Sequence, residues 1–259
     1  MARGERNIRL IMEYDGTYYH GFQTQDDPTL PTIQCTLEKA ILRICGERVR
    51  ITGSGRTDAG AHAIGQVVNF PTNASIPIDR FPMALNSALP KDIRIKAADC
   101  VHREFHARFD AIAKTYHYVV DNTSFESVFW RNYAYHVSQP LDLDKIKAGG
   151  AVLVGTHDFA SFQTSGSSAK TSVRTIYHFD VGAEGGLITF SIRANGFLYN
   201  MVRNIVGTLV EVGKGRLAVD AIPVILAARD RSKAGPTAPA HGLYLFEVDY
   251  DEGQALLNA

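Results

Sequence analysis

The segment GSGRTDAGAH, residues 53–62, holds the side chains of this chain that are best suited to chemistry. Its glycines permit positive φ angles or a close approach of the backbone to a ligand. Arg56 and Asp58 are two positions apart, so in an extended loop both side chains project to the same side. There they would combine anion recognition with a carboxylate nucleophile or base. Taken by itself, however, the segment fits a glycine-rich turn with a surface ion pair better.

Two familiar kinds of site do not fit this segment. A Walker phosphate-binding loop ends in Lys followed by Ser or Thr, and that pair is missing here. His62 and Asp58 suggest a metal site only weakly, because no third or fourth ligand follows at a useful spacing. The cysteines Cys35, Cys45 and Cys100 form no Cys-x-x-Cys pair and are expected to be small packing residues. We therefore expect no metal.

Composition indicates a globular protein with a substantial core. The chain has 259 residues, of which 45% are hydrophobic and 21% are charged. Its 27 Lys and Arg balance 27 Asp and Glu, and this neutrality by itself argues against a nucleic-acid partner. No apolar run approaches the ~20 residues that span a bilayer, and the N-terminus lacks the apolar region of a signal peptide. The sequence predicts a soluble, cytoplasmic protein.

Hydrophobic periodicity predicts the elements that would position the loop. Residues 8–14 alternate between apolar and polar types, which predicts a half-buried strand ended by Asp15-Gly16. Further strands are expected at residues 115–120, 176–181, 187–192 and 243–250, and helices at residues 31–46, 79–85, 142–154, 197–212 and 223–229. Helices separate most of these strands and a hairpin joins two of them. We therefore expect an α+β fold of two halves, residues 1–108 and 109–259, with a mixed sheet.

Six motifs that follow one another along the chain resemble those of tRNA pseudouridine synthases of the TruA type. They are YDGTYYHGFQTQ, GSGRTDAGAHA, FHARFDAIAKTYHY, SVRTI, NGFLYNMVRNIVGTL and GPTAPAHGLYL. The resemblance extends from Ile8 to Tyr250. It implies the pseudouridine synthase fold, in which two similar α/β halves carry a largely antiparallel sheet flanked by helices and the C-terminal half completes the active-site cleft. It also implies isomerisation of uridine to pseudouridine at positions 38, 39 and 40 of the tRNA anticodon stem-loop, without a cofactor.

The resemblance implies a role for five residues. Asp58 would be the catalytic carboxylate, which attacks C1′ of the ribose or assists cleavage of the glycosidic bond. Arg56 would contact phosphate or hold a neighbouring base, and Tyr116 would pack on the target base, as flipped bases are held by stacking. Arg203 would pair with Asp58 and keep it ionised, and Leu243 would line the base pocket. From the residues alone, Tyr116 and Leu243 also fit the core, and both arginines fit a solvated surface.

The resemblance also implies partners, namely tRNA through its anticodon arm and a second copy of the chain in a homodimer, with no membrane. Arg229, Arg231 and Lys233 are the basic residues expected to contact phosphate. Since the chain is neutral, its tRNA-binding face would have to arise by folding and dimerisation. A noncatalytic RNA-binding module would be indicated by the loss of Asp58, Arg56 or Tyr116, and all three are present. An Asp-dependent hydrolase would need metal ligands or a second carboxylate in a motif, and the sequence supplies neither.

Overall fold

The computed structural model describes residues 5–27, 29–166 and 169–255, and it divides the chain into two compact units. The first unit contains Met1–Ile112 and Leu245–Ala259, and the second contains Ala113–Tyr244. The sequence-based division assigned all residues from 109 onward to the second half. That assignment is wrong for the last residues, because strand β10 (Leu243–Tyr250) joins the sheet of the first unit. None of the helices among the described residues is long and apolar enough to cross a membrane.

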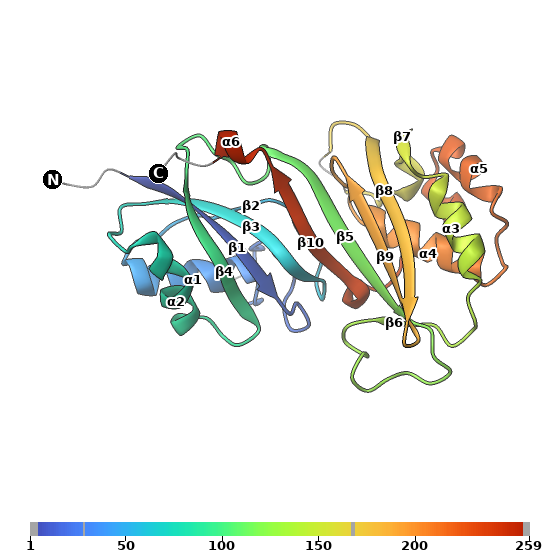
Figure 1. Cartoon of the computed structure of the whole chain (residues 1–259), viewed down its shortest axis with the longest axis horizontal. Coiled ribbons are helices and arrows are strands. Elements are labelled where there is room, and N and C mark those ends of the chain that lie inside the picture. Colours follow the sequence, from blue (N-terminus) through green and yellow to red (C-terminus); the bar gives the residue numbers. More distant parts are fainter. Residues whose placement is uncertain (1–4, 28, 167–168, 256–259) are drawn as a thin grey trace. The chain divides into compact units, whose positions relative to one another are not determined.

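The first unit is a sheet that carries two main helices (Figure 1). Its strands lie in the order β4 (Ile93–Val101), β1 (Arg6–Tyr14), β3 (His62–Thr72) and β10, and β2 (Thr52–Gly53) pairs with β3. Its helices are α1 (Ile33–Cys45), the short η1 (Ile78–Arg80), α2 (Phe81–Ala88) and α6 (Glu252–Ala255). β1 is antiparallel to both of its neighbours, and α1 packs against α2.

The ends of α1 follow from local chemistry. The Thr32 side chain accepts a hydrogen bond from the Cys35 N–H at 3.3 Å and caps the helix start. Gly46 ends the helix with φ of 74°, a left-handed conformation that glycine adopts without strain. The expected helix is therefore confirmed. Asp79, which was expected to cap the next helix, instead lies within η1, makes no cap and pairs with Arg80 at 3.4 Å.

β1 is buried on both faces from Asn7 to Leu10, so the prediction of a half-buried strand is wrong for this part, whereas Glu13 further along is partly exposed as expected. Ile8 and Leu10 point into the main core as expected. On the opposite face Arg9 is also buried, its guanidinium 3.0 Å from the Asp99 carboxylate and 5.9 Å from the centre of the Tyr250 ring. The chain's last strand and the segment after β4 cover this face. The small core that they build contains Val67, Val101, Phe105, Ala107 and Ala255.

The second unit is also a sheet with helices packed on it (Figure 1). Its strands lie in the order β5 (Ala111–Asp121), β9 (Leu187–Ala194), β8 (Val173–Glu184) and β7 (Gly155–Asp158), and β6 (Tyr135–His136) pairs with β5. Its helices are α3 (Leu143–Ala151), η2 (Ala160–Phe162), α4 (Met201–Gly213), α5 (Ala221–Ala228), η3 (Arg231–Lys233) and η4 (Ala240–Gly242). In this sheet order, β5 and β9, β9 and β8, and β8 and β7 pair antiparallel, whereas β6 pairs parallel with β5. The expected α+β class with a mixed, largely antiparallel sheet is confirmed.

The β8–β9 hairpin also agrees with the sequence. Glu184 pairs with Leu187, and the two residues between them, Gly185 and Gly186, have φ of 58° and 85°. Two consecutive positive φ angles characterise the type I′ turn, whose twist matches that of the flanking strands. The Gly-Gly pair therefore determines both the position and the type of this turn.

Helix α4 begins four residues later than the expected range, 197–212. The reason is Asn200, which precedes the helix with φ of 59°, a left-handed conformation that a right-handed helix does not include. The N–H of Met201 donates to the Leu198 carbonyl at 3.0 Å in the turn before the helix. Phe197 therefore leaves the helical path, and its ring makes a side-chain contact with a neighbouring strand.

Candidate active site

The loop between β2 and β3 carries Arg56 and Asp58. Thr57, which stands between them, is buried, whereas Arg56 is exposed and Asp58 is partly exposed. This is the alternation of an extended segment, in which neighbouring side chains point to opposite sides. The backbone of Thr57 is held as well, because its carbonyl accepts the Phe22 N–H at 3.1 Å. The loop thus turns Thr57 into the first unit and leaves Asp58 accessible.

A tight turn follows Asp58 directly. The Ala61 N–H donates to the Asp58 carbonyl at 3.1 Å, and Gly60 has φ of 78°. Since Ala59 has a negative φ, this is the pattern of a type II turn, which requires a positive φ at its third position. The Gly60 N–H donates to the Tyr19 carbonyl at 3.2 Å. The glycine of the motif is therefore needed to fix the chain immediately after the carboxylate.

A buried network of four polar side chains holds the loop from inside. The Thr57 Oγ1 is 2.8 Å from the Tyr14 hydroxyl, and the Gln66 Nε2 donates to that hydroxyl at 3.4 Å. Gln66 also donates to the Gly55 carbonyl at 2.8 Å and accepts from the Ser54 hydroxyl at 2.7 Å. Burial raises the pKa of Tyr14 to about 12, although the hydrogen bonds to Thr57 and Gln66 oppose this rise. Tyr14 is thus a neutral hydrogen-bonding group at physiological pH.

The segment after β1 lies close against the loop and has no room for side chains at two glycines. A Cβ on Gly21, which has φ of +85°, would lie 2.8 Å from the Thr57 carbonyl oxygen. A Cβ on Gly16 would lie 1.9 Å from the Ala61 carbonyl oxygen. Such a distance is impossible without a shift of backbone. Both glycines of the segment DGTYYHG are therefore required for its contact with the Asp58 loop.

The contacts of His62 indicate a structural role. Its Nδ1 accepts the Gly16 N–H at 3.1 Å and lies 3.3 Å from an Asp15 carboxylate oxygen. The same oxygen accepts hydrogen bonds from the backbone and the hydroxyl of Thr17. His62 is buried and joins the start of β3 to the turn after β1. Within the part of the chain that the structure describes, no three His, Cys, Asp or Glu side chains gather as a metal site would require.

Tyr116 lies on β5 in the second unit. It stands opposite Ile192 of β9 in the antiparallel register and is largely buried. Its ring meets Phe197 edge to face, with centroids 4.9 Å apart and an interplanar angle of 77°. Such a contact fixes the plane of the tyrosine ring. The late start of α4 makes this contact possible.

Arg203, on the first turn of α4, is held in place on several sides. Its Nε donates to the Ala238 carbonyl at 2.7 Å, and its Nη1 donates to the Asn200 side chain at 3.0 Å. The Ala238 N–H in turn donates to the Arg203 carbonyl at 3.1 Å. Burial raises the pKa of the nearby Tyr118 well above its usual value, and the Arg203 charge opposes that rise. The expected pairing of Arg203 with Asp58 would join the two units, and it stays a prediction.

Leu243, the first residue of β10, is buried in the second unit. The preceding Gly242 has no space for a side chain, because a Cβ there would lie 2.7 Å from the Tyr118 ring. The Tyr118 hydroxyl donates to the Pro239 carbonyl at 2.7 Å. These contacts fix the backbone on the N-terminal side of Leu243. A role for this residue in a base pocket stays a prediction.

Of the arginines expected to contact phosphate, Arg231 instead makes hydrogen bonds within the protein. Its guanidinium donates to a backbone carbonyl at 2.9 Å, to the Asn204 side chain at 3.0 Å and to Thr237 at 2.9 Å. Asn204 belongs to α4, so Arg231 fastens the GPTAP loop to that helix. Arg229 is more exposed and pairs with Asp158 at 3.0 Å. Arg229 therefore fits the expected phosphate contact better than Arg231 does.

Sequence reasoning missed the residues that hold the loop, above all Tyr14, Thr57 and Gln66. The alternation of residues 8–14 predicts only that Tyr14 ends a strand, and no pattern in the sequence singles out Gln66. The one available signal was Thr57, since a polar residue between Arg56 and Asp58 must point away from the side that those two share. Its partners come from β1 and β3, and the sequence shows no sign of that pairing.

Comparison with known proteins gives consistent matches over most of the chain. A family model described as tRNA pseudouridine synthase matches residues 10–110 and 151–251. The chain is 52% identical over 245 residues to tRNA pseudouridine synthase A of Acetivibrio thermocellus, which covers 95% of this chain and 100% of the relative. It is 47% identical to tRNA pseudouridine synthase A of Thermoanaerobacter sp. strain X514, with the same coverage, and 46% identical to that of Bacillus pumilus, with 94% and 99% coverage. The first matched segment includes Arg56 and Asp58, and the second includes Arg203 and Leu243.

Proposed function

The chain belongs to the tRNA pseudouridine synthase family, and from this premise we propose that it modifies uridines 38, 39 and 40 of the tRNA anticodon stem-loop, with Asp58 as the catalytic carboxylate. The enzyme is an isomerase that acts on tRNA uridine. The observation that carries the assignment of Asp58 is its position in the GRTDAG motif. There the residues on both sides of it are held by the first unit while its own side chain is accessible.

The reaction rearranges one nucleotide without oxidation or reduction. The N1–C1′ glycosidic bond breaks, the uracil ring turns, and C5 forms a new bond to C1′, after which C5 loses its proton and N1 gains one. A carboxylate can serve by attacking C1′ or by assisting bond cleavage at the ribose, where an oxocarbenium-like state develops. Either role requires an ionised side chain at a fixed distance from the sugar. The type II turn and the buried network around Thr57 supply that fixed position.

Arg56 is proposed to contact the tRNA beside the target. It is exposed and lies two residues before Asp58 on the same loop. A guanidinium is well suited to this role, since it binds phosphate through several N–H donors or stacks on a base. Because Gly55 is held by Gln66, the backbone that carries Arg56 is fixed on that side.

Three residues of the second unit are proposed to act on the same uridine. Tyr116 would stack on the uracil, and its edge-to-face contact with Phe197 supports this role by fixing the plane of its ring. Arg203 would keep the catalytic carboxylate ionised, and its hydrogen bonds to Asn200 and Ala238 support this role by fixing the guanidinium. Leu243 would contact the base through its apolar side chain.

The proposed partner is tRNA, bound through its anticodon arm by a homodimer in the cytoplasm. The neutral overall charge of the chain means that its tRNA-binding surface is formed by local clusters of basic residues. Recognition would then depend mainly on the folded shape of the tRNA. Binding is expected to weaken less with salt than that of a strongly basic protein.

The test of this proposal is tritium release from unmodified tRNA that carries C5-tritiated uridine, because C5 loses its hydrogen in the reaction. Asp58→Asn is expected to abolish release and to leave tRNA binding intact. Asp79→Asn is the matched control, since Asp79 is an exposed carboxylate of the same unit outside the loop. Mapping of pseudouridine in the product identifies the modified positions. Release by the Asp58→Asn enzyme at the wild-type rate would refute the assignment of the carboxylate, and product outside the anticodon arm would refute the proposed positions.

A further inference from the structure

Asn200, the residue before α4, has a rare backbone conformation and does not cap the helix that it precedes. Its φ is 59°, and among the described residues other than glycine only Arg229 shares a positive φ. Asparagine enters this left-handed region more readily than most residues, but the conformation still costs free energy. Asparagine is also one of the best N-cap residues, yet the Asn200 side chain makes no capping hydrogen bond to α4. Its conformation therefore calls for another explanation.

Two other helices of the chain show what an ordinary cap looks like. Thr32 precedes α1 with φ of −126° and accepts the Cys35 N–H at 3.3 Å. Asp142 precedes α3 with φ of −79° and accepts the Lys145 N–H at 3.1 Å. In both cases a side-chain oxygen reaches the third residue of the helix from a negative φ. Since Asn200 lacks this contact, the stability of the helix does not account for its conformation.

The Asn200 side chain instead forms hydrogen bonds in two directions. Its Oδ1 accepts from Nη1 of Arg203 at 3.0 Å, and its Nδ2 donates to the Thr164 hydroxyl at 3.1 Å. Because a guanidinium has only donors, the amide oxygen has to face Arg203 and the amide nitrogen has to face Thr164. The Thr164 N–H also donates to the carbonyl of Tyr199, the residue before Asn200, at 3.1 Å. Asn200 thus joins Arg203 to the segment that follows η2.

That segment is held by a buried residue of α4. The side chain of Asn204 is fully buried, and its Nδ2 donates to the Phe162 carbonyl at 2.8 Å and to the Thr164 hydroxyl at 3.4 Å. Its Oδ1 accepts from Arg231 at 3.0 Å and from Thr237 at 2.6 Å. A buried polar network whose members are all paired is rigid. The hydroxyl that anchors the Asn200 amide is therefore held in place by the core of the second unit.

The contact with Asn200 fixes the direction in which the Arg203 guanidinium points. The Nε of Arg203 donates to the Ala238 carbonyl at 2.7 Å, and its Nη1 donates to Asn200. A hydrogen bond at one nitrogen allows the planar group to turn about that bond, whereas hydrogen bonds at two nitrogens fix its plane. Loss of the Asn200 amide would return rotamer freedom to a long side chain that is only partly buried.

We propose that Asn200 is a positioning residue for catalysis, which acts through Arg203. The inference rests on the proposed role of Arg203 beside the catalytic carboxylate and deepens it. A guanidinium pairs with a carboxylate through N–H groups of fixed geometry, so the pairing depends on the direction of its plane. Asn200 sets that plane before tRNA binds, and no reorientation is needed during the reaction. The positive φ and the missing cap are the structural consequences of this orientation.

The test separates kcat from KM by tritium release from C5-tritiated tRNA. Asn200→Gly removes the amide and keeps the left-handed conformation without strain. Its melting temperature is expected to stay close to that of the wild type, and its KM is expected to be unchanged. Its kcat is expected to fall about 10-fold or more, because a displacement of ~1 Å in an active site can cost ~100-fold in rate.

A second pair of variants tests whether Asn200 acts through Arg203. Arg203→Met is expected to lower kcat, and Asn200→Gly/Arg203→Met is expected to have the same kcat as Arg203→Met alone, since residues that act as a unit are not additive. Thr164→Val removes the hydroxyl that anchors the Asn200 amide. Its kcat is expected to fall with KM unchanged, which keeps the inference testable if Asn200→Gly does not fold.

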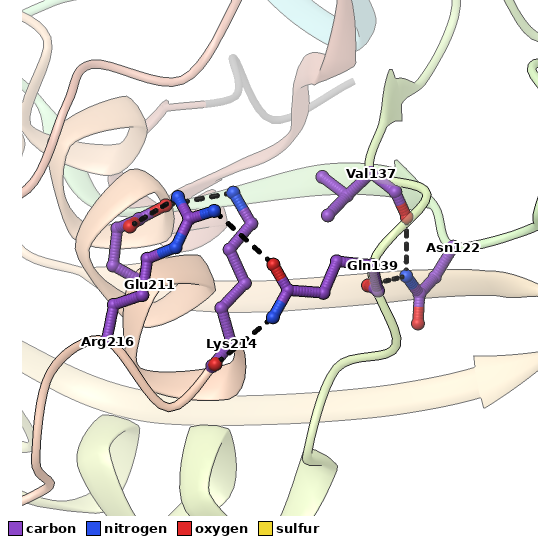
Figure 2. Close-up of polar contacts among 6 residues, drawn as sticks. All are labelled: Asn122, Val137, Gln139, Glu211, Lys214 and Arg216. Atoms are coloured by element: carbon purple, nitrogen blue, oxygen red, sulfur yellow. Dashed lines mark hydrogen bonds and ion pairs between the residues drawn. The ribbon is translucent and has the colours of Figure 1, made fainter.

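Gln139→Ala is the matched control, because Gln139 holds the other end of α4 (Figure 2). The Gln139 amide donates to the Lys214 carbonyl at 3.2 Å and accepts from Arg216 at 3.4 Å, so it also makes two hydrogen bonds. Both basic side chains pair with Glu211 of α4. Gln139→Ala is expected to leave kcat unchanged. An equal fall of kcat in Gln139→Ala and Asn200→Gly would trace the effect to a loosened helix and overturn the inference.

The remaining outcomes separate this inference from the proposed function. Wild-type kcat in Asn200→Gly together with a reduced kcat in Arg203→Met overturns the inference alone. Wild-type kcat in both variants overturns the role of Arg203 and, with it, that of Asn200. A loss that appears only in KM assigns Asn200 to tRNA binding instead. Losses that multiply in the double variant show that Asn200 acts independently of Arg203, which also overturns the inference.

Discussion

Thr57 offers the sharpest test of how the first unit holds the catalytic loop. Thr57→Val removes one hydroxyl and keeps the outline of the side chain. The hydroxyls of Thr57 and Tyr14 are 2.8 Å apart, and either of them can be the donor. In both cases the valine variant removes a hydrogen bond from the buried Tyr14 hydroxyl.

The magnitude follows from that single unmade hydrogen bond. A buried polar group without a partner costs about 1–3 kcal/mol. In a chain of this size, each kcal/mol lowers the melting temperature by about 2–4 °C, so a decrease of roughly 3–10 °C is expected. The effect on the reaction is expected to be larger, because Thr57 immediately precedes Asp58. A displacement of a reacting group by about 1 Å can cost ~100-fold in rate, so we expect kcat to fall about 10–100-fold.

The assay is steady-state tritium release, which separates kcat from KM, together with thermal unfolding of the same samples. KM is expected to stay near the wild-type value, because the loop's exposed surface is unchanged. Thr57→Ser keeps the hydroxyl and is expected to restore most of kcat. Tyr14→Phe removes the other half of the same hydrogen bond. The two changes together are expected to cost less than the sum of their separate effects, with a coupling energy of about 1 kcal/mol.

Two results would refute this reasoning. If Thr57→Val lowers the melting temperature as expected and leaves kcat unchanged, the network stabilises the fold but does not position Asp58. If the effects of Thr57→Val and Tyr14→Phe on stability are strictly additive, the two side chains do not share an interaction in solution.

Two further predictions concern the same unit. Gly21→Ala is expected to lower the free energy of unfolding by more than ~1 kcal/mol and to lower kcat, because the new methyl group meets a loop carbonyl oxygen 2.8 Å away at a position with a positive φ. Gly46→Ala is the control: this position has φ of +74° and open space around it, so the change should cost only about 1 kcal/mol of stability and leave kcat unchanged. Equal losses of stability for the two variants in urea unfolding would contradict the steric argument. The pKa of Tyr14 is about 12 in the folded state, against an ordinary value of 10.0, so as the pH rises the folded protein keeps the Tyr14 proton after the unfolded chain has lost it. The stability that Tyr14 contributes in this way is complete below pH 10 and is lost as the pH rises toward 12. Between pH 10 and 12, urea unfolding of the wild type should show the free energy of unfolding falling by up to about 1.4 kcal/mol per pH unit because of Tyr14, and this contribution should be absent in Tyr14→Phe. An identical pH dependence of both proteins would show that Tyr14 is not responsible.

Elements governed by neighbouring residues were predictable from the sequence. The hydroxyl of Thr32 and the free φ of Gly46 determine where α1 begins and ends, and the Gly185-Gly186 pair determines the β8–β9 turn. The GRTDAG motif is equally local: its glycine supplies the positive φ of the turn after Asp58. In each case the cause acts over a few residues, so the amino-acid types alone carry the information.

The sequence by itself thus indicated the family, the α+β class, the location of five strands and five helices, and the residue proposed for catalysis, but it did not indicate strands β3 and β4. Only the tertiary structure decided what lies against those elements. Arg9 is buried because the chain's last strand returns to the first unit, and Arg231 is engaged because α4 offers it Asn204. The start of α4 at Met201, preceded by Asn200 whose amide donates to the Thr164 hydroxyl, and the hydrogen bond between Thr57 and Tyr14 likewise involve residues far apart in the chain. Such contacts arise only on folding, when distant segments meet, so neither periodicity nor residue type could have shown them.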